Sequence, residues 1–336
     1  MDRYKLTGKE KILIVRHDRL GDLVLTLPMA QVLKDMYPEL QIDFLVSEYN
    51  HQLLKYSDSI DGYITADTVN NIPKGMPELI NELNAAKYDI VIFARPDLYT
   101  TFTAFMADID LRLGTARRAY SFLYNIRVEI SRRFAGIHEL DLNLKLLEPL
   151  GITIKPGSID PILKIPEGVN EMPSRLHDLK HYVVVHSGSK GSSPNWPEVY
   201  YAALIEKISK HYMVILTGQG KAVIDESNSI INYIDRTNFD QLVNILANAD
   251  LFISGSTGPL HIAAALGTPV IGLYPDHPVL GPHRWGPRGK RTTVFAPLKH
   301  SGHKCRINNN GTCDCMELIT VEEVYDRAIE ILNSEA

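Results

Sequence analysis

The chain has 336 residues, which is long for a single hydrophobic core, so we expect two domains of about 150 to 180 residues each. Its 45% hydrophobic and 22% charged residues are typical of a folded, water-soluble protein, and a formal net charge of -5 argues against a general nucleic-acid-binding protein. No apolar run approaches the roughly 18 residues of a membrane-spanning helix, and the N-terminus lacks the apolar segment of a secretory signal, so we expect a cytoplasmic protein.

The first half of the chain alternates apolar runs typical of buried strands with helical patterns. We predict strands at 12–16, 42–48 and 89–94 and helices at 22–37 and 78–87. This alternation favours right-handed βαβ crossovers and a parallel sheet covered on both faces. Residues 155–180 are rich in proline, glycine and polar side chains, and we interpret them as the linker between an N-terminal domain, 1–165, and a C-terminal domain, 175–336.

The alternation restarts after this linker. Predicted strands lie at 181–187, 212–218, 250–255 and 269–275, and predicted helices lie at 197–210, 240–249 and 259–267. We therefore predict an α/β protein made of two Rossmann-like parallel-sheet domains that face each other across a cleft, at the carboxyl ends of their strands. The last helix of the chain can complete the second domain or pack back on the first.

The segment DLFISGSTGPLHIAAALG, residues 250–267, has the pattern of a strand, a tight loop and a helix. A proline stands at the first helical position and a glycine just past the last. Such a helix points unpaired backbone N–H groups and the positive end of its dipole at an anion. Gly258 allows close approach, and Ser256, Thr257 and His261 can contact phosphate or sugar oxygens. As an alternative, Ser256 and Thr257 cap the helix and His261 is a core residue.

Two further loops follow predicted strands of the second half. SGSKGSSPNWP, after the strand that ends near His186, combines small residues with Lys190 and has the composition of a loop that cradles a diphosphate. A polar linker before a helix has the same composition. LTGQGK carries Gln219 at a place suited to ribose or base contacts. Because the carboxyl ends of parallel strands meet at one edge, these loops together predict a site for a nucleotide diphosphate.

In the first half, the strand at 12–16 leads directly into VRHDRLGD and a helix, where a dinucleotide-binding enzyme would carry G-x-G-x-x-G. This junction has only Gly21, which disfavours an NAD-dependent oxidoreductase. Asp22 lies at the start of the helix, where the dipole stabilises a carboxylate by about 0.3 to 1 kcal/mol, so a capping role is one interpretation. The other is a general base that faces a nucleotide diphosphate and removes a proton from an acceptor hydroxyl.

Three cysteines lie in one C-terminal stretch, HKCRINNNGTCDC. With His303, the set Cys305, Cys313 and Cys315 has the residue types of a metal site, but the spacing is not a usual zinc spacing. A structural or variable surface loop is the alternative, and we assign no metal site.

Three stretches together resemble glycosyltransferase family 9, the ADP-heptose:lipopolysaccharide heptosyltransferases: ILIVRHDRLGDLVLTLPMAQVLKDMYP, VVVHSGSKGSSPNWPEVYYAALIEKI and DLFISGSTGPLHIAAALGTPVIGLYP. The resemblance spans nearly the whole chain and includes the closing CMELITVEEV. It implies a GT-B architecture, an inverting mechanism, an ADP-sugar donor held mainly by the C-terminal domain, and no required cofactor; Mg²⁺ is compatible with it but not implied. It also implies that Asp22 is the general base. The implied donor-binding residues are Ser187, Ser189, Lys190, Gln219, Thr237, Ser256, Thr257, Gly258 and His261.

Two positions depart from the family's pattern. Members often have an aspartate before Thr-Gly, where this chain has Ser256, which puts the contact with the donor sugar in question. They also often carry lysine or arginine two residues before the W-P pair, where this chain has Pro194, and Lys190 is expected to compensate. A transferase that uses another nucleotide sugar, and a non-catalytic protein that binds a nucleotide sugar or a glycan, are therefore alternatives.

Residues 112–133, RLGTARRAYSFLYNIRVEISRR, carry six arginines and one glutamate among aromatic residues. Arginine forms bidentate contacts with carboxylate and phosphate, and the resemblance implies an anionic, lipid-linked saccharide acceptor. We therefore predict that Arg112, Arg117 and Arg118 bind the acceptor and that this segment docks the protein peripherally at the cytoplasmic face of the inner membrane. A solvated basic face with no partner is the alternative.

Overall fold

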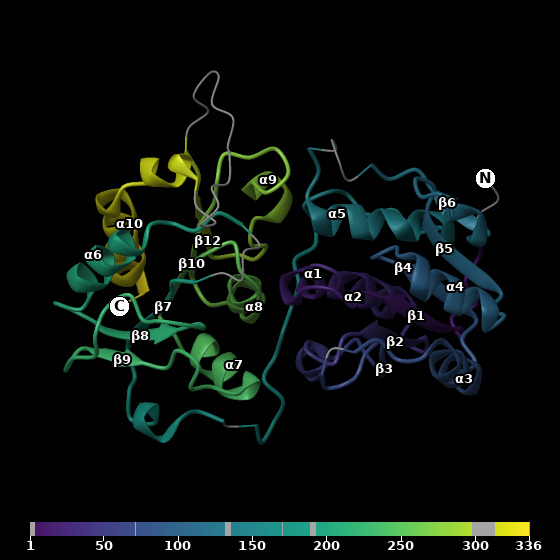
Figure 1. The fold of residues 1–336 in the computed structure, drawn as a ribbon, viewed down its shortest axis with the longest axis horizontal. Coiled ribbons are helices and arrows are strands. Elements are labelled where there is room, and N and C mark those ends of the chain that lie inside the picture. The colour runs from purple at the N-terminus through teal and green to yellow at the C-terminus, as the bar shows by residue number, and fades with distance from the viewer. Residues whose placement is uncertain are drawn as a thin grey trace. The chain divides into compact units, whose positions relative to one another are not determined.

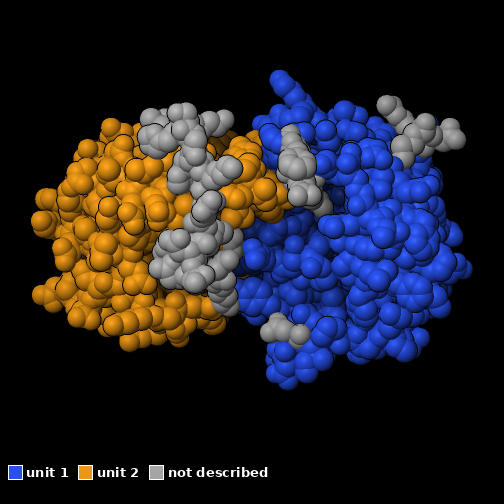
Figure 2. All heavy atoms as spheres, turned by 45° about the horizontal axis from the view of Figure 1, so that its top comes forward, with its two compact units in different colours: residues 1–164 blue, residues 165–336 orange. Residues whose placement is uncertain are grey.

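The computed structural model describes residues 4–70, 72–131, 136–169, 171–188, 193–297 and 313–335. The chain divides into two compact units, Met1–Lys164 and Ile165–Ala336, which Figure 2 colours separately. The division falls inside the stretch 155–180 that the sequence predicts as a linker. Within the described ranges, no helix combines the length and the apolar character needed to cross a bilayer.

The first unit is built on a parallel six-stranded sheet with the order β3-β2-β1-β4-β5-β6 (Figure 1). Its strands are β1 (Lys11–Val15), β2 (Gln41–Val46), β3 (Gly62–Thr65), β4 (Ile90–Phe93), β5 (Leu111–Thr115) and β6 (Ile126–Val128). The central strands β1 and β4 are almost entirely buried apolar runs, as a parallel sheet covered on both faces requires. The order is that of a Rossmann domain, whose topological switch point lies between β1 and β4.

Helices cover this sheet. They are α1 (Leu20–Val24), α2 (Leu27–Met36), α3 (Met76–Ala86), α4 (Leu98–Met106) and α5 (Glu139–Leu144), with the 3₁₀ segments η1 (His51–Tyr56), η2 (Ser121–Leu123) and η3 (Lys145–Leu150). The predicted helix 22–37 is wrong in one respect, since it is two helices. Pro28 lies in the first turn of α2, where it has no N–H to donate and its ring excludes a carbonyl four residues earlier. The break leaves α1 as a short helix that holds Asp22 directly after β1.

The second unit repeats the topology with the order β12-β11-β10-β7-β8-β9, so its switch point lies between β7 and β10. Its strands are β7 (Tyr182–His186), β8 (Met213–Thr217), β9 (Ile230–Asn232), β10 (Leu251–Gly255), β11 (Val270–Leu273) and β12 (Thr292–Phe295). Its helices are α6 (Glu198–Ile208), α7 (Phe239–Ala247), α8 (Gly258–Leu266), α9 (Pro282–Trp285) and α10 (Val321–Glu335), with η4 (Ser174–Leu176) and η5 (Asp314–Leu318).

α10 completes the core of the second unit. Its side chains Val324, Ala328 and Leu332 join the buried cluster of that unit, and the helix packs against α6. The indole N–H of Trp196 donates to the carbonyl of Ile319, just before α10, at 2.9 Å. The last helix is thus part of the second unit's own core, where the sequence left open a packing on the first domain.

Candidate active site

The charged residues nearest the switch point of the first unit follow β1 and β4. Residues 16–18, Arg-His-Asp, come directly after β1, and Asp22 lies in the first turn of α1. Arg95 and Asp97 follow β4, the strand next to β1. Ligands of doubly wound sheets bind outside the carboxyl ends of the strands at this point. This switch-point cluster therefore lies where such a sheet holds its substrate.

A buried guanidinium organises the cluster. Arg16 is 3% exposed and binds three carboxylates at once: Asp18 through Nε at 2.8 Å, Glu139 of α5 through Nη1 at 3.3 Å, and Asp22 through Nη2. Burial alone would lower the pKa of Arg16, but the three carboxylates, Asp22 foremost, raise it. The arginine therefore stays charged and fixes the position of the Asp22 carboxylate.

Asp22 has the properties of a base that works near neutral pH. Its pKa is raised from 3.8 to about 6, mainly because burial penalises the charged form; Arg16 lowers it, and Asp18 and Glu139 raise it. A carboxylate of this pKa is ionised at pH 7 and is a stronger base than an exposed aspartate. A role as a helix cap alone would lower the pKa, because the dipole favours the anion. Burial therefore outweighs the effect of the dipole at Asp22, and its role as a general base stays a prediction.

A histidine, an arginine and an aspartate extend the cluster toward α4. His17 Nε2 lies 2.8 Å from Asp97 Oδ2, and Arg95 Nη1 lies 3.1 Å from the same histidine nitrogen. Burial would raise the pKa of Asp97, but hydrogen bonds from His17 and from Thr100 lower it. Arg95 Nε approaches Asp18 Oδ2 at 3.4 Å, so this group and the one around the buried guanidinium are continuous. Together they offer several charged groups to a polar acceptor.

The three arginines predicted to bind the acceptor differ in their surroundings. Arg112 donates through Nε to the carbonyl of Leu123 at 2.9 Å and lies over the ring of Phe105, so its guanidinium supports the local structure. Arg117 and Arg118 are exposed in the loop after β5. The structure thus leaves Arg117 and Arg118 available to a ligand, and an acceptor contact of all three stays a prediction.

Tyr120 connects this loop to the switch-point cluster. Its pKa is raised, mainly by burial; nearby Arg118 and Arg95 lower it, and nearby Asp97 raises it. Arg118 therefore lies at the same edge of the sheet as the residues that follow β4.

In the second unit, α8 begins directly after β10, at the switch point. Thr257 is the N-cap residue of α8, but its hydroxyl is engaged by the hydroxyl of Ser254 at 2.9 Å and not by the first turn of the helix. Thr257 thus caps α8 without a side-chain hydrogen bond to the helix, and its contact with a donor stays a prediction. Pro259 lies in the first turn and Gly267 ends the helix in the left-handed conformation, as the sequence predicts.

Two further predicted donor residues flank this turn. Ser256 hydrogen-bonds the side chain of Tyr274, which follows β11. His261 is 4% exposed inside α8. Such burial is typical of a core histidine, which was the alternative interpretation, and its contact with a donor stays a prediction. Gly258 is the first residue of α8 and is half-buried.

The loops after β7 and β8 lie against each other. A Cβ atom on Gly188 would lie 3.6 Å from the carbonyl oxygen of Gln219, so the two loops are in contact range. Ser187 is half-buried and Gln219 is exposed. His186, at the end of β7, contacts Thr217 Oγ1 at 3.2 Å, and burial lowers its pKa to about 4, which leaves it neutral at pH 7. The structure thus brings Ser187 and Gln219 to one edge of the sheet.

The loop after β9 is tied to the loop after β8. The backbone N–H of Gly220 donates to Asp235 Oδ2 at 2.8 Å, and the N–H of Asp235 donates to the carbonyl of Gly218 at 3.0 Å. Thr237 follows in this loop and is half-buried. It therefore lies at the same edge of the sheet as Gln219.

Some predicted residues cannot be placed. Ser189 and Lys190 lie outside the described residues, as do His303 and Cys305, and their roles stay predictions. Cys313 and Cys315 are buried, with their sulfur atoms 3.2 Å apart. Across the described ranges, no group of three or more His, Cys, Asp and Glu side chains is arranged to hold a metal ion.

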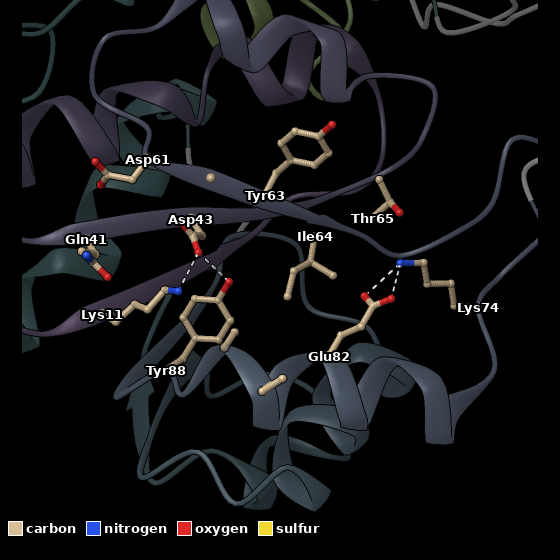
Figure 3. Close-up of a pocket in the computed structure, with 13 residues that line it drawn as sticks. Lys11, Gln41, Asp43, Asp61, Tyr63, Ile64, Thr65, Lys74, Glu82 and Tyr88 are labelled. Carbon is tan, nitrogen blue, oxygen red and sulfur yellow. Dashed lines mark hydrogen bonds and ion pairs between the residues drawn. The ribbon is translucent and has the colours of Figure 1, made fainter.

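A second polar surface of the first unit is a groove beside β3 (Figure 3). Its charges pair with one another: Lys11 with Asp43 at 3.3 Å, and Lys74 with Glu82 at 2.8 Å. Tyr88 also donates to Asp43, at 2.8 Å. Lys11 begins β1, so the groove reaches the amino ends of the strands, whereas parallel sheets bind ligands at the carboxyl ends. We therefore assign the candidate site to the switch-point cluster and not to this groove.

Arg16 is the central residue of the switch-point cluster, and it was not among the residues that the sequence pointed to. The available signal was an arginine directly after a buried apolar strand, because a charge at such a position needs a partner. Its distant partner, Glu139, lies in a segment that the sequence analysis assigned to no element.

Comparisons with known proteins connect this geometry to a family. Residues 76–312 match the model of glycosyltransferase family 9 (heptosyltransferase). Lipopolysaccharide heptosyltransferase 3 of Escherichia coli K12 is 30% identical over 285 residues, which cover 76% of this chain and 79% of that protein. A glycosyltransferase family 9 structure from Veillonella parvula superposes with a TM-score of 0.81 at 21% identity, covering 99% of both chains. The structure of E. coli ADP-heptose lps heptosyltransferase II gives a TM-score of 0.78 at 21% identity, covering 97% of this chain and 99% of the other. The predicted α/β fold of two Rossmann-like parallel sheets, the GT-B class, is confirmed.

Proposed function

The chain belongs to glycosyltransferase family 9, and we propose that this glycosyltransferase moves a heptose from ADP-heptose to an acceptor of the lipopolysaccharide-core type, with inversion at the anomeric carbon. The observation that carries the proposal is the state of Asp22, a carboxylate with a pKa of about 6 that buried Arg16 binds at the switch point of the first unit. The names of the E. coli relatives support the choice of donor and acceptor.

On the acceptor side, Asp22 removes the proton from the attacking hydroxyl. The acceptor oxygen forms a bond to the anomeric carbon while the bond from that carbon to the β-phosphate oxygen breaks. ADP leaves with the bonding electron pair, and the proton stays on Asp22. Attack from the face opposite ADP inverts the configuration. Arg117 and Arg118 bind anionic groups of the acceptor in this proposal.

On the donor side, the diphosphate binds at the N-terminus of α8, where first-turn N–H groups and the loop hydroxyls donate to its oxygens. The bond between Ser254 and Thr257 holds this loop in shape. Residues at the ends of β7, β8 and β9 contact the nucleoside, and Lys190 stabilises the charge that develops on the leaving group. ADP is a good leaving group, so the proposal requires neither a second acid nor a cofactor.

The reaction requires that Asp22 of the first unit and the α8 loop of the second unit reach the same donor molecule. The proposed location is the cytoplasm, with peripheral contact at the inner membrane, where a lipid-linked acceptor is accessible. Domain closure around the donor would bring the base to the reacting hydroxyl.

The test is a mass-spectrometric assay of ADP-heptose with lipopolysaccharide-core acceptors. We expect a product heavier by one heptose and an equal amount of ADP, and nuclear magnetic resonance of the product should show the inverted anomer. Asp22→Asn should lose this activity, whereas the control Asp326→Asn, at an exposed position of α10 outside the proposed site, should retain most of it. ADP binding without consumption of any nucleotide sugar would instead identify a non-catalytic binder.

A second candidate is the same reaction with a different nucleotide sugar. It is favoured by Ser256, which stands where members of the family often carry aspartate and which hydrogen-bonds Tyr274. A panel of nucleotide sugars in the same assay separates the two candidates. Faster turnover of another donor than of ADP-heptose would select this one.

A further inference from the structure

Helix α4 of the first unit buries mainly polar side chains and exposes large apolar ones. The side chains that it buries are Thr100, Thr101, Thr103 and Ala104. The side chains that it exposes are Leu98, Phe102, Phe105 and Met106, with exposed fractions of 57%, 37%, 42% and 51%. These four lie at positions i, i+4, i+7 and i+8 and therefore form one apolar stripe along the helix. A helix that covers a sheet normally turns such a stripe toward the core.

The buried threonines are compatible with the fold because their hydroxyls are satisfied. Thr100 donates to Asp97 Oδ2 at 2.5 Å, and Thr101 shares a hydrogen bond of 2.8 Å with the hydroxyl of Tyr124. Neither contact gives the unit a reason to carry large apolar side chains on the outer face of α4. The outer stripe is therefore better explained by a partner that covers it.

One end of the stripe is flanked by cationic side chains. Phe122 is 74% exposed on η2, and η2 packs against α4. Arg117 and Arg118 are exposed in the loop that leads into η2. Arg117 pairs with Glu129 at 3.4 Å, and both side chains are more than half exposed. The stripe and the arginines thus form one surface that is apolar in the middle and basic at the η2 end.

We propose that α4 and η2 form a docking surface for a lipid leaflet with anionic headgroups. The apolar stripe and Phe122 enter the boundary between headgroups and acyl chains, while Arg117 and Arg118 bind lipid phosphates. Asp108 and Asp110 are exposed past the C-terminal end of α4, so the η2 end faces the leaflet more closely. A second copy of the chain is a poorer occupant, because a two-fold contact across η2 would bring identical arginines together.

The surface also suits the proposed function, and this step alone rests on it. Asp97 is the N-cap residue of α4 and hydrogen-bonds His17, which is part of the switch-point cluster that holds Asp22. A leaflet against α4 would therefore present a lipid-linked acceptor at the edge of the sheet that carries the base.

The test is co-sedimentation with vesicles made of equal parts phosphatidylethanolamine and phosphatidylglycerol, without any sugar donor or acceptor. The variant Leu98→Gln/Met106→Gln/Phe122→Gln changes only side chains that are more than half exposed, so it should fold, which circular dichroism checks. The matched control is Met36→Gln/Val69→Gln/Val199→Gln, at exposed apolar positions elsewhere. We expect the α4 variant to bind at least about tenfold more weakly than the wild type and the control to bind unchanged.

A second readout locates the contact. Phe122→Trp should shift its emission to the blue when anionic vesicles are added, whereas Val199→Trp should not, with the wild type subtracted to remove Trp196 and Trp285. The proposal would be overturned if the wild-type protein did not bind these vesicles. It would also be overturned if the α4 variant bound them as tightly as the wild type. A third refuting outcome is a sedimentation experiment in which the wild type is a dimer and the α4 variant is a monomer. Vesicle binding with no transferase activity would instead contradict only the proposed function.

Discussion

Replacing Asp22 by asparagine should abolish turnover and at the same time stabilise the first unit. The wild-type carboxyl has a pKa of about 6 in the folded protein against an ordinary value of 3.8. This difference means that holding the carboxylate ionised in its buried position costs about 3 kcal/mol of folding free energy above pH 6. Asparagine has the same shape and no charge, and Arg16 retains Asp18 at 2.8 Å and Glu139 at 3.3 Å. We therefore expect a gain of about 1 to 3 kcal/mol at pH 8.

The sign of the pH dependence follows from the raised pKa. Between about pH 4 and pH 6 the folded wild type holds a proton that the unfolded chain has released, so wild-type stability falls as pH rises through this window. The variant has no such group. Its advantage should be small at pH 4 and should grow until about pH 6, beyond which it stays constant.

The two tryptophans allow the effect to be assigned to one unit. Trp196 and Trp285 both belong to the second unit, so urea unfolding followed by their fluorescence reports on that unit and should not change. Hydrogen exchange of the amides of β1 and β4, measured by mass spectrometry at pH 4.5 and pH 8, reports on the first unit. Turnover should fall at least about a hundredfold in the assay described above.

Three outcomes would refute this reasoning. If the variant turned over within a few-fold of the wild-type rate, Asp22 would not be the general base. Faster exchange of β1 and β4 amides in the variant at pH 8 would mean that the ionised carboxylate stabilises the fold. An equal gain at pH 4.5 and pH 8 would show that the gain does not come from the charge.

Three other expectations concern the same cluster and the sheet that carries it. The rate of the wild type should rise with pH through a limb near pH 6, since the base must be ionised; a flat profile from pH 5 to 8 would contradict the pKa of Asp22. Arg16→Met should move this limb to higher pH, because burial and the neighbouring acids then act on Asp22 unopposed. The same variant should cost about 3 to 5 kcal/mol of unfolding free energy, because buried Glu139 loses its ion pair with Arg16. If the limb of this variant stayed near pH 6, Arg16 would not be lowering the pKa of Asp22. Gly114→Ala should destabilise the first unit by about 1 to 3 kcal/mol, because its Cβ would lie 2.5 Å from the buried ring of Tyr124; unchanged amide exchange in β5 would show that the ring can yield.

Burial on both faces is what makes the central strands predictable from sequence. β1, β4, β7 and β10 lie in the middle of their sheets and are continuous apolar runs. The strands β3, β5, β6, β9 and β12 were not predicted. Four of them, β3, β6, β9 and β12, are edge strands. β6 and β9 have only three residues, and the burial of β3 and β12 is partial, so no period distinguishes these four from loops.

The candidate site divides in the same way. Asp22 and the start of α8 could be predicted because each depends on residues adjacent in the chain. The role of Arg16 depends on Glu139, which lies 123 residues later, and no local pattern links them. Arg112 also has a contact that composition does not reveal, since its guanidinium donates to the carbonyl of Leu123, and its contact with an acceptor stays a prediction.

The two switch points have the same topology but opposite electrostatics, and this difference separates their roles. In the first unit a buried guanidinium gathers carboxylates, which suits proton transfer and disfavours a second anion such as a diphosphate. In the second unit the corresponding strand ends in His186, neutral at pH 7, and the α8 turn offers hydroxyls and backbone amides, which can receive an anion. Because each set is packed in its own unit, Asp22→Asn should leave the affinity for ADP within about twofold of the wild type while turnover is lost. A calorimetric titration in which ADP affinity falls with turnover would place the diphosphate beside Asp22 and reverse this assignment.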